Sequence, residues 1–356
     1  MNRLSENKLK YHVDRLLDIK EKGETYPVHI TIGLTEYCCH KCVFCHSEFA
    51  TSDTTRNATM QREQLISFLK EAYECGVKSV TLVGSGEPLL HPEIEEILRD
   101  IKNIGLEIGI FTNGSKAKGT LLNTIIDTCT FVRFSINAGD SKEHEKVHGV
   151  VGDFENIVSN VSEMVKKKKE KNLKFPTIGT QMVFYEGNYR SMVKAAKMWG
   201  EIGVDYFEIK PVIAGEGNQV DKTVFPAKDK EEVHKLMDEA KQYETNTYNV
   251  YTKYNQYIVT QDTNNRQYTK CYGSLLDMNL WADGNIFVCA NLEHERYIIG
   301  NIYKNTFKEI WNGEQKKKIR QSINLKACPK GCRCHFMNEY IWDYLHPDKE
   351  IHPNFV

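Results

Sequence analysis

Apolar positions recur with two alternating periods over most of the chain. From residue 28 to about 240, short β-branched or apolar runs alternate with longer segments whose apolar residues recur every three or four positions. The first pattern is typical of buried strands and the second of amphipathic helices. The predicted strands cover 28–35, 79–88, 106–114, 131–139, 177–184 and 205–213, and the predicted helices cover 60–77, 91–105, 120–129, 153–169, 189–203 and 228–243.

Six strand–helix units in series predict an α/β fold, with a parallel sheet and right-handed crossovers wound as part of a barrel. Ligands of such sheets bind at the carboxyl ends of the strands. The most distinctive short motifs all fall at that edge. They are "TEYCCHKCVFCHSE" (35–48), "GSGEP" (84–88), "FTNG" (111–114), "VRFSIN" (132–137) and "FEIKP" (207–211).

The alternation stops near residue 245, where we expect a domain boundary. "ADGN" between two alternating apolar runs over 275–290 predicts a hairpin, and a further helix is expected over 306–323. The expected organisation has three parts. They are an N-terminal helical extension (1–27), a partial (β/α)6 barrel (28–245) and a small α+β domain (246–356).

Composition and charge argue against several classes of protein. A net charge of -1 gives no reason to expect nucleic acid or an anionic membrane as a partner. The basic run "KKKKEK" at 166–171 closes a helical pattern, where cations favour the helix C-terminus. No apolar stretch approaches the ~20 residues of a membrane span, and the amphipathic start lacks the apolar core of a signal peptide. These features predict a cytoplasmic protein.

Eleven cysteines in a reducing compartment indicate metal ligation rather than disulfides. A structural zinc site uses four ligands in two pairs, whereas the early set offers three well-spaced thiols on one loop. Three thiolates leave one iron of a four-iron cluster open to a small molecule. Cys75 and Cys129 stand alone and are expected to be small buried hydrophobes. The early set is Cys38, Cys39, Cys42 and Cys45, and the later set is Cys271, Cys289, Cys328, Cys332 and Cys334.

The C-x3-C-x2-C spacing of Cys38, Cys42 and Cys45, directly after the first strand of a barrel, resembles the radical S-adenosylmethionine (radical SAM) superfamily. In that family three cysteines hold a [4Fe–4S] cluster, and SAM chelates the fourth iron. The resemblance implies reductive cleavage of SAM to methionine and a 5′-deoxyadenosyl radical, which takes a hydrogen atom from the substrate. Cys39 is expected to face the packing side of the loop. A non-catalytic iron–sulfur or zinc-binding protein is the alternative.

The other strand-end motifs supply residues expected to contact SAM. "GSGEP" resembles the "GGEP" motif of the family, whose backbone accepts hydrogen bonds from the SAM ammonium. A simple Asn-Gly turn is an equally good explanation of "FTNG". The expected cofactor-binding residues are Phe44, Gly84, Ser85, Gly86, Glu87, Asn113, Ser135 and Gln181.

The inner face of the predicted barrel carries candidates for the substrate site. Glu208 and Lys210 alternate on one strand, and charges inside a barrel are costly unless they pair or bind a ligand. Lys210 and Gln181 are therefore the predicted catalytic residues. His144 and His148, four residues apart, suit one helix face, but no acidic or thiol ligand is near in sequence, so a loop or helix-cap role is expected.

The later cysteines, the "DGN" hairpin and the closing "CPKGCRC" (328–334) resemble the SPASM/Twitch extensions of radical SAM enzymes. Full SPASM domains carry seven cysteines and two auxiliary clusters, so five cysteines fit the shorter Twitch-like type with one cluster. A four-thiolate zinc ribbon is the alternative. The predicted ligands of a second [4Fe–4S] cluster are Cys271, Cys289, Cys328 and Cys332, with Cys334 as the alternative.

A fully ligated auxiliary cluster suits electron transfer. We therefore expect two-electron oxidation of a small polar substrate, such as a sugar, an aminocyclitol or a nucleotide-linked molecule, with a flavodoxin- or ferredoxin-type electron donor. Epimerisation would need a donor thiol in the barrel, and the second to sixth strands contain no cysteine. Maturation of a ribosomal peptide is the alternative. Peptide-modifying relatives carry an extra N-terminal domain, and only about 27 residues precede the first strand here.

Overall fold

The structure of the protein is a computed structural model. It describes residues 8–45, 57–212, 228–254, 257, 266–292, 295–328, 332, 334–348, 350, 352 and 354. Among these residues, one sheet of ten strands has the order β10-β9-β8-β1-β2-β3-β4-β5-β6-β7. The strands are β1 (His29–Gly33), β2 (Ser79–Val83), β3 (Glu107–Thr112), β4 (Phe131–Ser135), β5 (Thr177–Phe184), β6 (Tyr206–Pro211), β7 (Asn249–Thr252), β8 (Asp277–Leu280), β9 (Asn285–Phe287) and β10 (Ile298–Asn301).

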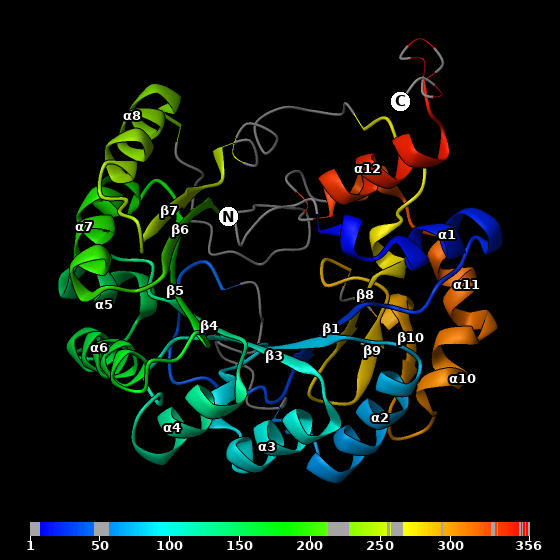
Figure 1. Cartoon of the computed structure of the whole chain (residues 1–356), viewed down its shortest axis with the longest axis horizontal. Helices are drawn as coiled ribbons and strands as arrows, with labels where there is room; N and C mark the ends of the chain where they lie inside the picture. The colour runs from blue at the N-terminus through cyan, green and yellow to red at the C-terminus, as the bar shows by residue number, and fades with distance from the viewer. Residues whose placement is uncertain are drawn as a thin grey trace.

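Strands β8 and β1 to β7 pair in parallel, and β9 and β10 extend the sheet in antiparallel pairing. Figure 1 shows this sheet curved into an open barrel, with the helices that follow the strands on its outer side. The helices are α1 (Val13–Lys22), α2 (Arg62–Glu74), α3 (Ile94–Ile104), α4 (Gly119–Thr128), α5 (Ser141–His148), α6 (Phe154–Glu170), α7 (Met192–Ile202), α8 (Lys230–Lys241), α10 (Phe307–Asn312), α11 (Glu314–Gln321) and α12 (His335–Leu345).

The two faces of the sheet differ in chemistry. The side chains that face the helices are apolar and fully buried, as Ile30, Ile32 and Leu82 illustrate. The inner face carries polar side chains that bond across strands. His29 of β1, for example, contacts Asp277 of β8 at 2.7 Å and Thr81 of β2 at 2.7 Å. The burial of the outer face holds the barrel together, and the inner face is left to bind polar groups.

The predicted partial barrel is confirmed, since the six predicted strands pair in chain order as β1 to β6. The sheet nevertheless continues beyond residue 245, because β7 pairs in parallel with β6 and β8 pairs in parallel with β1. The predicted hairpin is formed by β8 and β9, with Gly284 at φ +82° in its turn. This hairpin is therefore part of the same sheet as the barrel.

Two helices differ from the sequence-based expectation. The segment predicted as one helix over 306–323 is divided at Gly313 into α10 and α11, because Gly313 has an extended backbone (φ −68°, ψ 150°). Helix α5 is not among the predicted helices, although the spacing of His144 and His148 suits one helix face. It is a two-turn helix that begins at the Asp140 cap, whose carboxylate accepts from the backbone N–H of Glu143, and ends at Gly149 with φ +63°.

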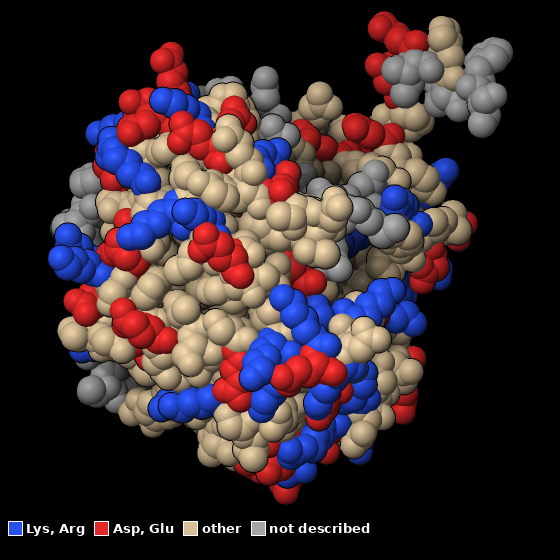
Figure 2. Space-filling model, turned by 60° about the vertical axis from the view of Figure 1, so that its left-hand side comes forward, with Lys and Arg blue, Asp and Glu red and all other residues tan. Residues whose placement is uncertain are grey.

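The basic helix end at 166–171 pairs with acidic side chains. Lys167, Lys168 and Lys171 each lie within 3.2 Å of an acidic side chain. The face shown in Figure 2 has Lys and Arg side chains interspersed with Asp and Glu. None of the helices among the described residues combines the length and apolar character needed to cross a membrane.

Candidate active site

The early cysteine loop lies at the carboxyl end of β1 and is held there by backbone hydrogen bonds to α5. The N–H of Lys41 donates to the carbonyl of His148 at 2.8 Å, and the N–H of Val43 donates to the carbonyl of Val147 at 2.9 Å. Gly149 permits this contact, since a Cβ atom there would lie 2.8 Å from the Lys41 carbonyl oxygen. The end of α5 thus fixes the middle of the cysteine loop.

The loop brings the thiols of Cys38, Cys39, Cys42 and Cys45 close enough to interact electrostatically, and the C-x3-C-x2-C spacing is what distinguishes the three ligand candidates from Cys39. Burial raises the pKa of the Cys38 thiol to about 12 and raises the pKa of Cys42 as well. Without a metal these thiols stay protonated at neutral pH, and iron must displace their protons to bind. Cys39 is exposed, as the residue Cys38 also is, instead of facing the packing side of the loop, and its Sγ accepts from the Asn113 amide at 3.3 Å.

The "GSGEP" loop supports the cysteine loop from the neighbouring strand β2. A Cβ atom at Gly86 would lie 2.2 Å from the carbonyl oxygen of Tyr37, so only glycine allows this contact. Glu87 is buried, and its carboxylate accepts from the Thr112 hydroxyl at 2.6 Å, from Asn113 N–H at 2.7 Å and from Leu89 N–H at 3.0 Å. Glu87 therefore ties β2 to the end of β3. A direct contact of Glu87 or Asn113 with SAM stays a prediction.

Burial raises the pKa of Glu87 to about 7, and the three hydrogen bonds only partly oppose this shift. Because the folded-state pKa lies above the ordinary value of 4.5, the contribution of Glu87 to stability is fully present below pH 4.5 and is lost as the pH rises towards about 7. We expect Glu87→Gln to remove this pH dependence. The side-chain amide of the glutamine would also place an N–H group against the Asn113 N–H, so that two donors face each other. We expect this contact to lower the free energy of unfolding by about 1–3 kcal/mol. Denaturant unfolding of both proteins at several pH values measures both effects, and an unchanged pH slope would contradict the assignment.

The predicted substrate residues lie together on the inner face of the barrel. Ser135 pairs in register with Gln181, and Gln181 with Glu208. Lys210 is two residues beyond Glu208 on the same face of β6 and is half-buried. Gln181 Oε1 is buried without a hydrogen-bond partner in the part of the chain that the structure describes. The structure thus brings Ser135, Gln181 and Lys210 to one surface, and their contacts with SAM or a substrate remain predictions.

Arg133 is a residue of the inner face that the sequence analysis did not single out. Its guanidinium bonds Glu208 at 2.5 Å and lies 3.7 Å above the ring of Phe111. Arg133 is the ion-pair partner that a charged Glu208 needs inside a barrel. Burial alone would raise the pKa of Glu208, but the positive charge of Arg133 opposes this effect and the pKa is lowered. The signal was present in the sequence, because Arg133 is a single charge in the apolar run "FVRFS".

A second group that sequence reasoning missed consists of His40, His144 and His148, whose ring nitrogens lie within 4.8 Å of one another. His144 and His148 face one side of α5, as their spacing suggests, and the third histidine comes from the cysteine loop more than a hundred residues earlier. His148 Nδ1 lies 3.3 Å from Cys42 Sγ. Sequence separation concealed this group, because the contact depends on how α5 meets the loop.

Phe44, the aromatic residue before Cys45, packs edge-on against Tyr185 with the ring centroids 6.1 Å apart. Tyr185 directly follows β5, so this contact links the cysteine loop to the carboxyl end of that strand. The expected approach of the Phe44 backbone to adenine stays a prediction.

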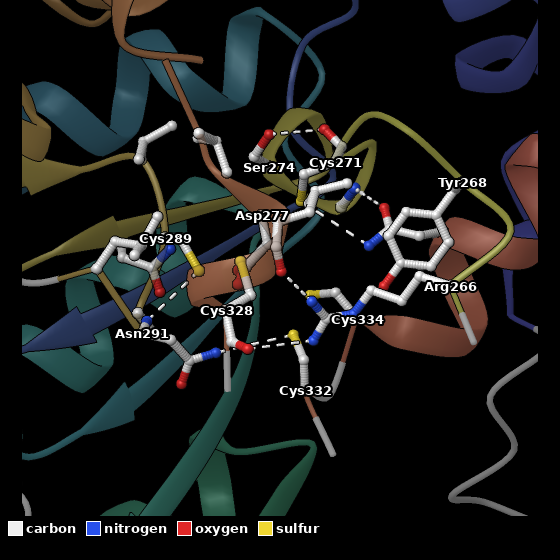
Figure 3. Close-up of a pocket in the computed structure, with 18 residues that line it drawn as sticks. Arg266, Tyr268, Cys271, Ser274, Asp277, Cys289, Asn291, Cys328, Cys332 and Cys334 are labelled. Atoms are coloured by element: carbon white, nitrogen blue, oxygen red, sulfur yellow. Dashed lines mark hydrogen bonds between the residues drawn. The ribbon is translucent and has the colours of Figure 1, made fainter. Parts of the chain in front are cut away.

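The later cysteines gather in a separate pocket. Figure 3 shows the five sulfur atoms drawn together from the segment before β8, the end of β9 and the segment before α12. Asn291 lies between two of them, since its N–H donates to Cys289 Sγ at 3.4 Å and its side-chain amide to Cys332 Sγ at 3.8 Å. Burial, together with the neighbouring Cys271 and Cys332, raises the pKa of the Cys328 thiol to about 11.

Cys334 occupies a distinct position in this pocket. A Cβ atom at Gly273 would lie 3.0 Å from Cys334 Sγ, so this thiol packs against the backbone directly after Tyr272. Cys334 and Asp277 also line a cavity of about 940 Å³ that enters the barrel at the amino ends of its strands. The choice of Cys271, Cys289, Cys328 and Cys332 as ligands, with Cys334 as the alternative, remains a prediction.

Comparison with known families gives two matches. The profile of the radical SAM superfamily matches residues 32–199, which include the early cysteine loop, the end of β1 and strands β2 to β5 of the barrel. The chain belongs to the radical SAM superfamily. The profile of an iron–sulfur cluster-binding domain, named SPASM, matches residues 271–335 and contains all five later cysteines. The radical SAM chain thus carries a SPASM-type domain, as the sequence predicted.

Individual relatives are distant. A probable GTP 3′,8-cyclase of Metallosphaera sedula is 29% identical over 52% of this chain, and the match spans 57% of that protein, little more than half its length. An AdoMet-dependent heme synthase of Methanosarcina barkeri is 24% identical over 85% of this chain and 87% of its own length. SuiB of Streptococcus suis, solved with S-adenosylmethionine, has the same fold, with a TM-score of 0.68, 18% identity, and coverage of 91% of this chain and 77% of that chain.

The residues present fit the cofactors that the two domains imply, namely SAM, a [4Fe–4S] cluster and auxiliary iron–sulfur ligation. The thiols of the early loop lie close together at a strand end, and three of them have the C-x3-C-x2-C spacing. The later pocket holds five thiols, and a closed four-iron cluster needs four. Both donor sets consist of sulfur, which is the usual ligand of iron–sulfur clusters.

Proposed function

We propose that this chain is a radical SAM oxidoreductase that oxidises a small polar substrate by two electrons. In balance, the substrate gives one hydrogen atom to the adenosyl carbon, one electron to the later cysteine site and one proton to solvent. An alcohol or amine carbon thereby becomes a carbonyl or imine. A flavodoxin- or ferredoxin-type protein is the proposed source of the reducing electron.

One observation carries this proposal. The early cysteines lie at the carboxyl ends of the strands, whereas the later pocket shares Asp277 and Cys334 with the cavity that enters at the amino ends. A substrate inside the barrel would therefore lie between the two cysteine sites. This arrangement suits removal of a hydrogen atom on one side and of an electron on the other.

When bound, the cofactors supply reductive cleavage of SAM at the early site and acceptance of one electron at the later site. The chain itself binds and orients the substrate. Arg133 and Glu208 hold each other in place, and Arg133 Nε and Gln181 Oε1 are buried without hydrogen-bond partners among the described residues. Because unpaired buried polar atoms are costly, we assign these two atoms to polar groups of the substrate or SAM. We assign Lys210 Nζ to an oxygen of the substrate.

Maturation of a ribosomal peptide is the second candidate. The supporting observation is the shared fold with SuiB, which has also been solved bound to its precursor peptide SuiA, with a TM-score of 0.67 to this chain. The polar inner face, with its buried Arg133–Glu208 pair, supports the small-molecule substrate. A peptide would have to present one polar side chain to that face.

Metal analysis tests the two-cluster arrangement on which the proposal depends. We expect anaerobically reconstituted protein to contain about eight iron and eight sulfide per chain, because two cubanes hold four of each. A content of about four iron and one zinc per chain would indicate that the later cysteines bind zinc, as in a zinc ribbon, instead of a cluster. That result would contradict the proposed electron acceptor. Mössbauer spectra of the same samples distinguish two cubanes from adventitious iron.

A further inference from the structure

The cavity at the amino ends of the barrel strands reaches a buried arginine. It has a volume of about 940 Å³, and its lining includes Phe111 of β3, Arg133 of β4 and Tyr206 of β6. Strand register places these three side chains in one layer across the barrel. A cavity of this size accommodates a small organic molecule, which would lie against the two aromatic rings and the guanidinium.

Arg133 is held firmly and still has an N–H group to offer. The residue is only 9% exposed, its Nη1 donates to Glu208 at 2.5 Å, and its guanidinium lies 3.7 Å above the Phe111 ring. Its Nε–H has no hydrogen-bond partner among the residues that the structure describes. A buried N–H without an acceptor is costly, and a guanidinium is shaped to receive the oxygens of a carboxylate or a phosphate.

The acidic residues that line the cavity interact with basic residues of the same lining. These pairs are Asp277 with His29 at 2.7 Å, Asp14 with Arg15 at 3.7 Å, and Glu107 with Lys8 through an electrostatic interaction. Arg133 differs from these basic residues, because its acidic partner Glu208 is not part of the lining. The cavity therefore ends at a positive charge.

Glu208 itself lies among several cations. Burial alone would raise the pKa of its carboxyl group, but the positive charges of Arg133, Lys210 and Lys253 oppose this effect and the pKa is lowered. Three cations thus act on one buried carboxylate at this side of the barrel. Because little water screens charges in a barrel interior, such a region favours a further negatively charged group.

We propose that the amino-end cavity binds an oxyanion of the substrate, either a carboxylate or a phosphate group, at the guanidinium of Arg133. The inference rests on the proposed function in one respect, which is that the occupant is the molecule to be oxidised. Ser135, two residues beyond Arg133 on β4, lies about 7 Å nearer to the carboxyl ends of the strands. The end of the substrate opposite its anionic group would therefore face the early cysteine site. The substrate class is a small organic acid or a phosphate ester, and not a neutral sugar.

Thermal unfolding of the reconstituted holoenzyme without SAM tests this site. The probes are sodium phosphate and sodium acetate, acetamide is the neutral counterpart of acetate, and sodium chloride keeps the ionic strength constant. We expect at least one anion to raise the unfolding temperature saturably, because a ligand of the folded state stabilises it, and acetamide to leave the temperature unchanged. The anion with the higher affinity identifies the class of the group. No saturable rise with either anion would overturn the proposal.

Arg133→Lys tests the assigned residue. Lysine keeps a positive charge for Glu208 but lacks the Nε–H and the forked guanidinium, so we expect anion binding to weaken about tenfold. The matched control is Arg99→Lys on α3, since Arg99 pairs with Glu95 and does not line the cavity. Anion binding in this control should equal that of the unmodified protein.

Unchanged anion binding in Arg133→Lys would overturn the proposal. If that variant failed to fold, the double variant Arg133→Met, Glu208→Met replaces it, because removal of both partners leaves no unpaired buried charge. Unchanged anion binding in the double variant would then overturn the proposal instead.

SAM also carries a carboxylate, and a phosphate titration in the presence of SAM distinguishes the two sources. Phosphate affinity that is not weakened by SAM supports an anion from a second molecule. Competition between SAM and phosphate would assign Arg133 to the SAM carboxylate and would overturn the proposal. Failure of the proposed function gives a different result, namely a holoenzyme that binds the anion through Arg133 but does not cleave SAM.

Discussion

Replacing Cys42 with alanine is expected to abolish SAM cleavage and to remove about four irons from the reconstituted protein. Cys42 belongs to the three-thiol loop and is half-buried between Lys41 and Val43, whose backbone N–H groups bond the end of α5. Two thiols do not hold a cubane that must also leave one iron open for SAM. Iron analysis and chromatographic measurement of 5′-deoxyadenosine after addition of SAM and dithionite check both parts of this prediction.

Cys39→Ala is the matched control for this substitution. Cys39 accepts a hydrogen bond at Sγ from the Asn113 amide and lies outside the C-x3-C-x2-C spacing, so its removal leaves the three-thiol loop intact. Iron content and 5′-deoxyadenosine release should match those of the unmodified protein. Loss of SAM cleavage in Cys39→Ala, with retention in Cys42→Ala, would show that the ligand register assigned to the loop is wrong.

Replacing Cys289 with alanine should have the second largest effect and should separate the two cysteine sites. We expect the iron content to fall by about half, because the later cluster loses a ligand while the early one is untouched. Release of 5′-deoxyadenosine should continue, since the early loop lies at the opposite edge of the barrel. Oxidised substrate should no longer form, because the electron left on the substrate has no acceptor.

Cys75→Ala is the control for nonspecific loss of a thiol. Cys75 is half-buried at the end of α2, away from both cysteine sets in sequence and outside the later pocket. It should retain both clusters. An unchanged iron content in Cys289→Ala would indicate that Cys334, and not Cys289, is the fourth ligand. Loss of 5′-deoxyadenosine release in Cys289→Ala would contradict the separation of the two sites.

The sequence predicted the barrel because its physical basis is local. The strands from β1 to β6 are short runs of β-branched and apolar residues, and the glycine after α3, Gly105, marks a helix end with φ +101°. The cysteine spacing is also local, so both thiol sets were found. Strand β7 was not recognised as part of the barrel, since four residues, "NVYT", carry little periodic signal.

The rest of the site depends on contacts between distant segments. The pairing of β8 with β1 joins residues almost 250 positions apart, as the His29–Asp277 contact shows. The same holds for His40 and His148, which meet only because Gly149 lets α5 approach the cysteine loop. Arg133 and Glu208 come from strands two apart in the sheet. None of these pairings has a periodic or spacing signal, so sequence patterns alone could not supply them.

Release of 5′-deoxyadenosine by the unmodified protein is the decisive measurement for a radical SAM enzyme. The protein should be reconstituted anaerobically with iron and sulfide, shown by its spectra to hold clusters, and mixed with SAM and dithionite. We expect 5′-deoxyadenosine and methionine in equal amounts. Clusters present at both sites with no 5′-deoxyadenosine formed would contradict this expectation.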